Sequence, residues 1–389
     1  MTSPAAPHGS VREVVGVFLR LGTIAFGGPV AHTAMMREEL VRRREWVTDE
    51  RFVDLMGATN LIPGPNSTEL AIHLGHERAG WRGLVWAGVC FIVPAALMVT
   101  GLAWAYVEYG ETPAFESVLY GVVPVVVAII AHALTGLLRT VLGFRKDARP
   151  RWWLVALAGA ALAAYFLGVH ELVILTSGAA LGALAHLVRH PPRRSAAGAV
   201  ALPLVWASGE EDRLLTLFLT MLKIGSVLYG SGYVLLAFLD GDFVDRLGWI
   251  TDQQLSDAIS VGQVTPGPVF TTATFIGYLV AGPAGAFVAT VGIFAPSFVF
   301  VGLLTRLTGW LRANDWTSWL LDGVNATALA LMAGVSWQLA RTAVVDPITV
   351  ALFATGLVAL LWTRLNSGWL IVAGAFVGIL LAPSGLLMM

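Results

Sequence analysis

The chain has 389 residues, of which 57% are hydrophobic and only 13% are charged. A soluble domain carries about a quarter charged residues, so this composition excludes an ordinary soluble protein. The net charge of −1 identifies no partner, and we expect no nucleic-acid binding. The single cysteine, Cys90, excludes an intrachain disulfide and a cysteine-based metal cage. The first dozen residues lack the pattern of a cleaved signal peptide.

Apolar segments follow one another along the whole chain, and most are long enough to cross roughly 30 Å of hydrocarbon. In the first half they lie at about 14–36, 52–75, 83–107, 117–138, 152–169 and 172–188. In the second half they lie at about 214–239, 254–279, 284–304, 317–339, 347–362 and 368–387. This pattern predicts an all-α polytopic membrane protein.

The two halves resemble each other at a fixed offset of 203 residues. The sequence WVTD at 46–49 recurs as WITD at 249–252, and Pro63-Gly64-Pro65 recurs as Pro266-Gly267-Pro268. Arg20 matches Lys223 at the same offset. Such internal repeats are the mark of a duplicated architecture. We therefore predict a first repeat at 1–188, a cytoplasmic linker at 189–213 and a second repeat at 214–389.

Each Pro-Gly-Pro lies in the middle of the second apolar segment of its half. Proline removes a backbone donor and clashes with the preceding turn, so these segments should be two half-helices, each about 15 Å long. If every segment crosses the membrane, the basic residues divide 9 to 13 between the two sides, with Arg20 and Lys223 inside the membrane. If the Pro-Gly-Pro segments enter and return on one side, the division is 19 to 3. Because cytoplasmic loops are rich in Lys and Arg, the second topology is favoured.

This topology has about five transmembrane helices and one re-entrant broken hairpin in each repeat. An odd number of crossings inserts the two repeats with opposite orientation, as in many secondary transporters. The amino terminus is then expected outside. A proline-kinked crossing in each half is the alternative.

The two broken hairpins are the expected site of chemistry. A half-helix amino end carries free N–H groups and partial positive charge, which suits an oxyanion. We expect Asn66 to cap the second half-helix and Glu69 to complete a capping box. In the second half, Thr271 and Thr272 would supply hydroxyl donors. The alternative is that these polar residues only cap broken helices.

Arg20 and Lys223 are the basic residues predicted to lie within spans. A cation at the bilayer centre costs about 2.5–3.5 kcal/mol and usually faces a pathway. Two such cations, from opposite faces, would suit a divalent anion. The alternative is that both side chains extend to the membrane surface. Glu69 and His73 are candidates for proton coupling, with helix capping and packing as their respective alternatives.

The sequence lacks the motifs of common enzymes and nucleotide-driven pumps. We therefore expect no enzymatic activity and no cofactor or metal. Transport would be driven by an ion gradient or by the membrane potential.

The motifs Phe26-Gly27-Gly28-Pro29 and Asn60-Leu61-Ile62-Pro63-Gly64-Pro65 resemble those of the chromate ion transporter family, in its long two-repeat form. The resemblance covers nearly the whole chain. It implies export of chromate across the bacterial inner membrane and resistance to chromate, with sulfate as an expected competitor. Tyr229-Gly230-Ser231-Gly232 in the second half lacks the proline of the first motif, which leaves equal contributions from the two halves open.

The residues expected to bind the anion come from both breaks, the two glycine motifs and the two cations. They are Arg20, Gly27, Gly28, Asn60, Pro63, Gly64, Pro65, Asn66, Ser67, Lys223, Gly230, Gln263, Pro266, Gly267, Pro268 and Thr271. A transporter of sulfate or another oxyanion and a passive anion channel remain alternatives. The lipid bilayer is the expected surrounding, and a homodimer is left open.

Overall fold

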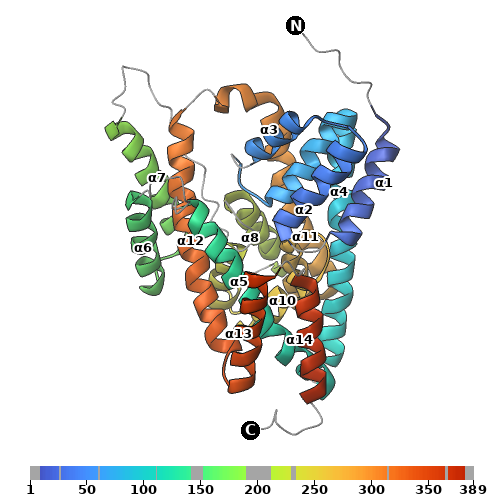
Figure 1. The fold of residues 1–389 in the computed structure, drawn as a ribbon, viewed down its shortest axis with the longest axis vertical. Coiled ribbons are helices and arrows are strands. Elements are labelled where there is room, and N and C mark those ends of the chain that lie inside the picture. The colour runs from blue at the N-terminus through green and yellow to red at the C-terminus, as the bar shows by residue number, and fades with distance from the viewer. Residues whose placement is uncertain are drawn as a thin grey trace.

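The computed structural model describes residues 9–25, 28–59, 62–110, 112–141, 152–189, 212–228, 234–312, 315–363 and 367–381. Every regular element in these ranges is a helix, which confirms the predicted all-α fold (Figure 1). The α-helices are α1 (Val11–Ile24), α2 (Gly28–Arg37), α3 (Asp49–Thr59), α4 (Asn66–Tyr109), α5 (Pro113–Val141), α6 (Trp152–Phe166), α7 (Glu171–Arg189), α8 (Arg213–Val227), α9 (Leu235–Leu239), α10 (Asp252–Val264), α11 (Thr272–Arg312), α12 (Asp315–Ala343), α13 (Pro347–Trp362) and α14 (Ser367–Leu381). The linker predicted at 189–213 lies almost entirely outside the described residues.

Four of the described helical stretches are long and apolar enough to cross a membrane. They lie at Asn66–Tyr109, Ser117–Thr135, Glu171–Val188 and Val269–Thr305. Many large apolar side chains on these helices are exposed, such as Leu97 at 67% and Phe287 at 70%. In water such a surface would aggregate, whereas lipid covers it without cost. The protein is therefore a multi-pass membrane protein, as its composition predicted.

The helices α4 and α11 are each folded back into a hairpin. The backbone turns at Ala79-Gly80 and again at Ala281-Gly282, where both glycines have φ of +59°. A Cβ atom on Gly83 would overlap with the carbonyl oxygen of Gly75, so the two arms of α4 touch. The same overlap joins Gly285 to Gly277 in α11. In each hairpin the arm after the turn is the one long enough to cross the membrane.

The outer ends of the first Pro-Gly-Pro segment lie together. Arg51, near the start of α3, forms an ion pair with Glu77, near the end of the short arm of α4, at 2.6 Å. The segment therefore enters and returns at one end of the molecule, as the distribution of basic residues predicted. We call this end, which also carries Arg78 and Arg42, the arginine end.

The segment expected to cross at 14–36 is instead two short helices, α1 and α2. Near the start of α1, Glu13 pairs with Arg78 at 2.9 Å. Beyond α2, the ring of Trp46 lies 5.1 Å from the Arg78 guanidinium. Both outer ends are thus at the arginine end, and the predicted single crossing is wrong. The reason is length: a helix of 14 residues is about 21 Å long, and it ends where the Gly-Gly-Pro motif begins.

The beginning of the described chain also lies at the arginine end. The amide of Gly9 donates to the carbonyl oxygen of Arg78 at 2.9 Å. The expectation that the amino-terminal region lies on the side opposite the arginine loops is therefore wrong. It followed from counting 14–36 as a full crossing.

The long arms of α4 and α11 pack against each other in opposite directions. Trp81 begins its arm and lies 3.0 Å from the Cβ position of Gly302, near the end of the α11 arm. Gly88, further along α4, contacts Phe298. The turns at Gly80 and Gly282 are therefore at opposite ends of the molecule.

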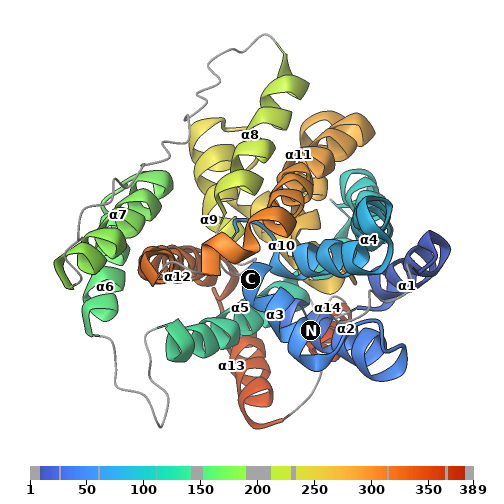
Figure 2. The same ribbon diagram turned by 90° about the horizontal axis from the view of Figure 1, so that it is seen from above.

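The remaining helices pack across the two halves. Gly178 of α7 contacts Gly323 and Thr327 of α12, and Gly121 of α5 contacts Gly374 of α14. Figure 2 shows α6 and α7 beside α12 on one flank. Small residues let these backbones approach closely, which is how helices associate in lipid.

Two π-helical turns occur at related places, at Glu38–Arg43 after α2 and at Asp240–Arg246 after α9. The amide of Arg44 bonds to the Glu39 carbonyl, and that of Leu247 bonds to the Asp242 carbonyl, both at 3.1 Å. π-turns are rare and often lie at functional sites. Here they place acidic side chains next to arginines.

Candidate oxyanion site

The first break is the chain between α3 and α4, described at 62–65. Pro63 and Pro65 cannot donate backbone hydrogen bonds, and Gly64 has φ of +133°, which favours glycine. The Gly64 amide donates to the carbonyl oxygen of Leu228, at the end of α8, at 2.7 Å. The first break therefore binds the second half of the chain. Asn60, predicted to belong to the site, lies outside the described residues.

The second break, at 265–268, makes the matching contact. Gly267 has φ of +96°, and its amide donates to the carbonyl oxygen of Ala25, at the end of α1, at 2.9 Å. Ala25 and Leu228 differ by the offset that separates Gly64 from Gly267. Each break is thus held by the end of a short helix from the other half, and Pro266 and Pro268 flank it as the proline pattern predicted.

The amino end of α4 points its first turn at the first break. The helix begins at Asn66, and Pro65 precedes it without any side-chain cap. The amides of Thr68 and Glu69 bond to the Pro65 carbonyl, at 2.8 Å and 3.0 Å. The predicted capping box of Asn66 and Glu69 is therefore wrong, because Asn66 is already helical and Glu69 is one position too far along.

Buried polar side chains surround this helix end. Ser67 contacts His32 Nδ1 at 3.2 Å, while His32 Nε2 contacts the Ala25 carbonyl at 3.0 Å. His32 thus joins the end of α1 to the start of α4. His32 follows the Gly-Gly-Pro motif by three residues, but no sequence motif marks it as part of the site.

Glu69 is fully buried, with 0% of its surface exposed. Its Oε1 and the Ser297 hydroxyl of α11 approach the same point beside Gly64, but neither carboxylate oxygen makes a hydrogen bond of normal geometry. The Thr68 hydroxyl is also buried without such a bond. Among the described residues, Glu69 has no ion-pair partner. An ordinary acid at the start of a helix accepts bonds from backbone amides, and Glu69 accepts none of normal geometry.

Most of the polar side chains at the second break already make hydrogen bonds. The hydroxyl of Thr271 donates to the Pro268 carbonyl at 2.8 Å, and that of Thr272 donates to the Val269 carbonyl at 2.9 Å. Their protons are therefore used locally. Gln263 differs, because its buried Nε2 has no hydrogen-bond partner. A buried amide donor without a partner is costly and is suited to an anionic ligand.

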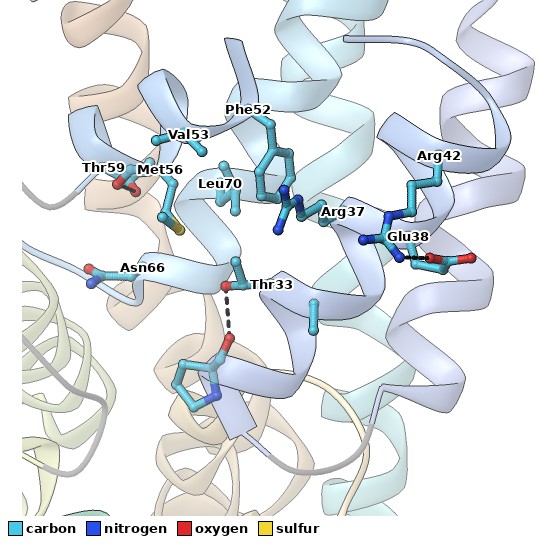
Figure 3. Close-up of a pocket in the computed structure, with 12 residues that line it drawn as sticks. Thr33, Arg37, Glu38, Arg42, Phe52, Val53, Met56, Thr59, Asn66 and Leu70 are labelled. Atoms are coloured by element: carbon cyan, nitrogen blue, oxygen red, sulfur yellow. Dashed lines mark hydrogen bonds and ion pairs between the residues drawn. The ribbon is translucent and has the colours of Figure 1, made fainter. Parts of the chain in front are cut away.

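A cavity of about 640 Å³ leads to the first break from the arginine end. Figure 3 shows Arg37 and Arg42 at one end of it and Thr59 and Asn66 at the other. Pro29 of the Gly-Gly-Pro motif also lines it. The cavity thus connects an exposed basic surface to the amino end of α4.

The arginines at the mouth are paired with carboxylates. Arg37 bonds to Asp49 at 2.7 Å, and Arg42 bonds to Glu38 at 3.3 Å. The Arg37 guanidinium lowers the pKa of the Asp49 carboxyl below its ordinary value. These pairs are exposed, so water and ions screen them, and an incoming anion can compete for the guanidinium.

The two predicted membrane cations have different positions. Arg20 is exposed on α1, whose buried face consists of other residues, and it does not line the cavity. Lys223 is mostly buried and pairs with Asp242 at 2.6 Å. Asp242 also accepts a bond from Arg246 at 2.9 Å. Lys223 therefore has an acidic partner, Asp242, that no motif in the sequence marks.

Of the other predicted site residues, the structure describes some and not others. His73 is buried one turn beyond Glu69 on α4. Gly28 begins α2, next to Pro29 in the cavity wall. Gly27 and Gly230 lie outside the described residues. Ser297 carries no motif in the sequence, and only the packing of α11 against α4 brings it to Gly64.

Comparison with known proteins matches the chain to one family. The chromate transporter family matches residues 12–183 and 215–379. The chain is 35% identical to the chromate transport protein of Cupriavidus metallidurans, over 97% of this chain and 95% of that protein. It is 32% identical to the probable chromate transport protein of Synechococcus elongatus, over 96% of each chain.

A third relative, the chromate transport protein of Pseudomonas aeruginosa, is 31% identical over 98% of this chain and 95% of its own length. No solved structure matches the chain. The family and the apolar helices together indicate a multi-pass protein of the bacterial membrane. The chain belongs to the chromate transporter family.

Proposed function

We propose that the protein is a secondary transporter that exports chromate from the bacterial cytoplasm and so confers resistance to chromate. The observation that carries this proposal is the reciprocal bonding of the two breaks to the opposite halves of the chain. Gly64 and Gly267 each donate to the end of a short helix from the other half. Broken helices inside a membrane are tolerated where they line a cavity or pack on protein, and their amino ends favour anions. The relatives named chromate transport proteins supply the substrate.

The cavity gives the cytoplasmic access route in this proposal. Its mouth is at the arginine end, which the distribution of basic residues assigns to the cytoplasm. Arg37, Arg42 and Asn66 line this cavity. The two arginines would attract the dianion, and Asn66, with Ser67 and the first turn of α4, would receive it. Gln263 would approach from the second half. Each net negative charge moved outward would release about 2.3 kcal/mol per 100 mV of inside-negative potential.

We also propose that residues 1–188 and 214–389 are inverted repeats. The opposed arms of α4 and α11 support this, as do the two stretches matched by one family. A pair of single-cysteine variants tests it, Gly80→Cys and Gly282→Cys, in a Cys90→Ala background. Both turns have φ of +59° and no atom within 4 Å of the Cβ position, so strain is equal in both.

A membrane-impermeant thiol reagent added to intact cells is expected to label only the Gly282→Cys variant. Everted vesicles should reverse the result, with labelling of Gly80→Cys. Labelling of both from one side would contradict the inverted arrangement.

The transport activity itself is tested with purified protein in liposomes. An inside-negative potential imposed on loaded liposomes should accelerate the efflux of chromate, and collapse of the potential should slow it. Sulfate and molybdate are assayed separately to define selectivity. Absence of chromate flux would overturn the substrate assignment. Flux as fast as the current of an open ion channel would favour a passive channel.

Arg37→Gln is expected to raise the KM for chromate several-fold with little change in kcat, because Arg37 lies at the mouth and not at the break. Its charge should act on the approach of the anion, and the effect should shrink at high salt. Arg43→Gln is the control, because Arg43 is also an exposed, paired arginine of this end but does not line the cavity. An equal effect of both substitutions would argue against the cavity as the route.

A further inference from the structure

Glu69 is a carboxyl group that the proposed anion site must accommodate. It lies on the first turns of α4, and it is buried completely, beside the Gly64 backbone. Neither of its oxygens has a hydrogen bond of normal geometry. A carboxylate and a divalent oxyanion at the same helix end would repel each other strongly in a medium of low polarity. The two negative charges cannot easily share this site.

We propose that Glu69 carries a proton whenever the oxyanion occupies the first break, so that one proton moves with each anion. This inference rests on the proposed oxyanion transport. The protonated carboxyl gains an O–H donor, which can bond to an oxygen of the anion instead of repelling it. The transported unit is then one dianion and one proton, with a net charge of −1. When the anion leaves, the proton leaves with it, and no electrons are transferred.

The groups next to Glu69 do not neutralise its carboxylate. On α4 itself His73 is one turn away, and on α2 His32 is bonded to Ser67 and Ala25. α11 presents the Ser297 hydroxyl. None of these is a fixed positive charge that would neutralise the carboxylate.

The charged groups on the other helices packed against α4 have partners or positions elsewhere. On α1, Arg20 is exposed and Glu13 pairs with Arg78. On α3, Arg51 pairs with Glu77. On α10, Asp257 accepts bonds from Tyr106 and Gln253.

The second break bears on how many protons accompany each anion. The position that matches Glu69 at the repeat offset is Thr272, whose hydroxyl is bonded to the Val269 carbonyl. Only one of the two breaks therefore carries an acid. One proton for each anion follows, and not two.

The experiment measures chromate flux and internal pH together, in liposomes that contain a pH-sensitive dye. With wild-type protein, chromate leaving the liposomes should carry protons out and raise the internal pH. Flux should fall by up to about tenfold per pH unit once the carboxyl ionises. In Glu69→Gln, whose side chain is always neutral, the chromate flux that remains should lose the accompanying proton movement and show a flatter pH profile. Both proteins meet the same species in solution, so the protonation of chromate itself cancels in the comparison.

Ser297→Ala is the control, since it alters the same contact without removing a titratable group, and it should keep the proton movement. Wild-type flux without a change of internal pH would overturn the inference, whether or not the variant folds. So would a Glu69→Gln profile identical to that of wild type. Absence of any chromate flux in wild type would instead mean that the proposed function is wrong.

Discussion

Gly64→Ala is expected to reduce chromate transport by more than tenfold while the protein still inserts in the membrane. Gly64 has φ of +133°, and a Cβ atom there would overlap with Glu69 Oε1 and lie 2.9 Å from Ser297 Oγ. Backbone strain of this kind costs about 1–3 kcal/mol, and overpacking adds about 1–3 kcal/mol. The cheapest relief is a shift of the break itself, which would disturb both its bond to Leu228 and the start of α4.

Gly267→Ala should have a similar effect, although its surroundings are different. Here the Cβ atom would lie 2.6 Å from the Cβ of Ala95 on α4, at φ of +96°. If the anion site uses both breaks, damage to either break should be enough to stop transport. A variant of one break that transports normally would show that this break is not part of the site.

The matched control for both substitutions is Gly57→Ala, near the end of α3. No atom lies within 4 Å of its Cβ position, and alanine favours a helix over glycine by up to about 1 kcal/mol. Flux should be unchanged, and thermal stability in detergent should be equal or higher. Flux is compared after correction for the amount of monodisperse protein, so that a folding defect is separated from a defect in transport.

The sequence predicted the two breaks well because their cause is local. Proline lacks an amide and clashes with the preceding turn whatever surrounds it, so Pro63 and Pro266 interrupt their helices without help from tertiary structure. The crossing predicted at 14–36 failed for a related reason. Apolar length alone suggested a span, although the Gly-Gly-Pro motif within it already held the signal for a break.

The partners of the site residues could not be read from the sequence in the same way. Ser297 reaches Gly64 only because the long arms of α4 and α11 are packed in opposite directions. Lys223 and Arg20 match at the repeat offset, which suggested a shared role as anion ligands. Their surroundings differ, since one is paired in a buried cluster and the other is exposed. Matching positions in a repeat therefore do not guarantee matching partners.

Asp242→Asn is expected to destabilise the protein by about 1–3 kcal/mol, because it removes the acceptor shared by Lys223 and Arg246. The Asp242 side chain is only 3% exposed, and its oxygens lie 2.6 Å from Lys223 Nζ and 2.9 Å from Arg246 Nε. Removal of one partner from a fully buried pair costs about 3–5 kcal/mol. The lower value expected here reflects the partial exposure of the two cations, which water can still reach.

Glu38→Gln is the comparison for this substitution, since Glu38 accepts bonds from Arg42 and Arg43 with 45% of its side chain exposed. Its loss should cost about 0–1 kcal/mol. Stability is measured as thermal unfolding in detergent for the two single variants and for the wild type.

A double-mutant cycle then decides whether Lys223 serves Asp242 or the anion. If Lys223 is a structural partner, the double variant Asp242→Asn with Lys223→Met should be more stable than Asp242→Asn alone. The second substitution removes the buried cation that the first leaves unpaired. Additive losses would mean that the two side chains do not depend on each other. Lys223 could instead bind the substrate when the transporter changes conformation. In that case Lys223→Met should abolish chromate flux, and adding Asp242→Asn should not restore the flux. The geometry favours the first result, since the carboxylate of Asp242 already fills the position that an oxyanion would need beside the Lys223 ammonium.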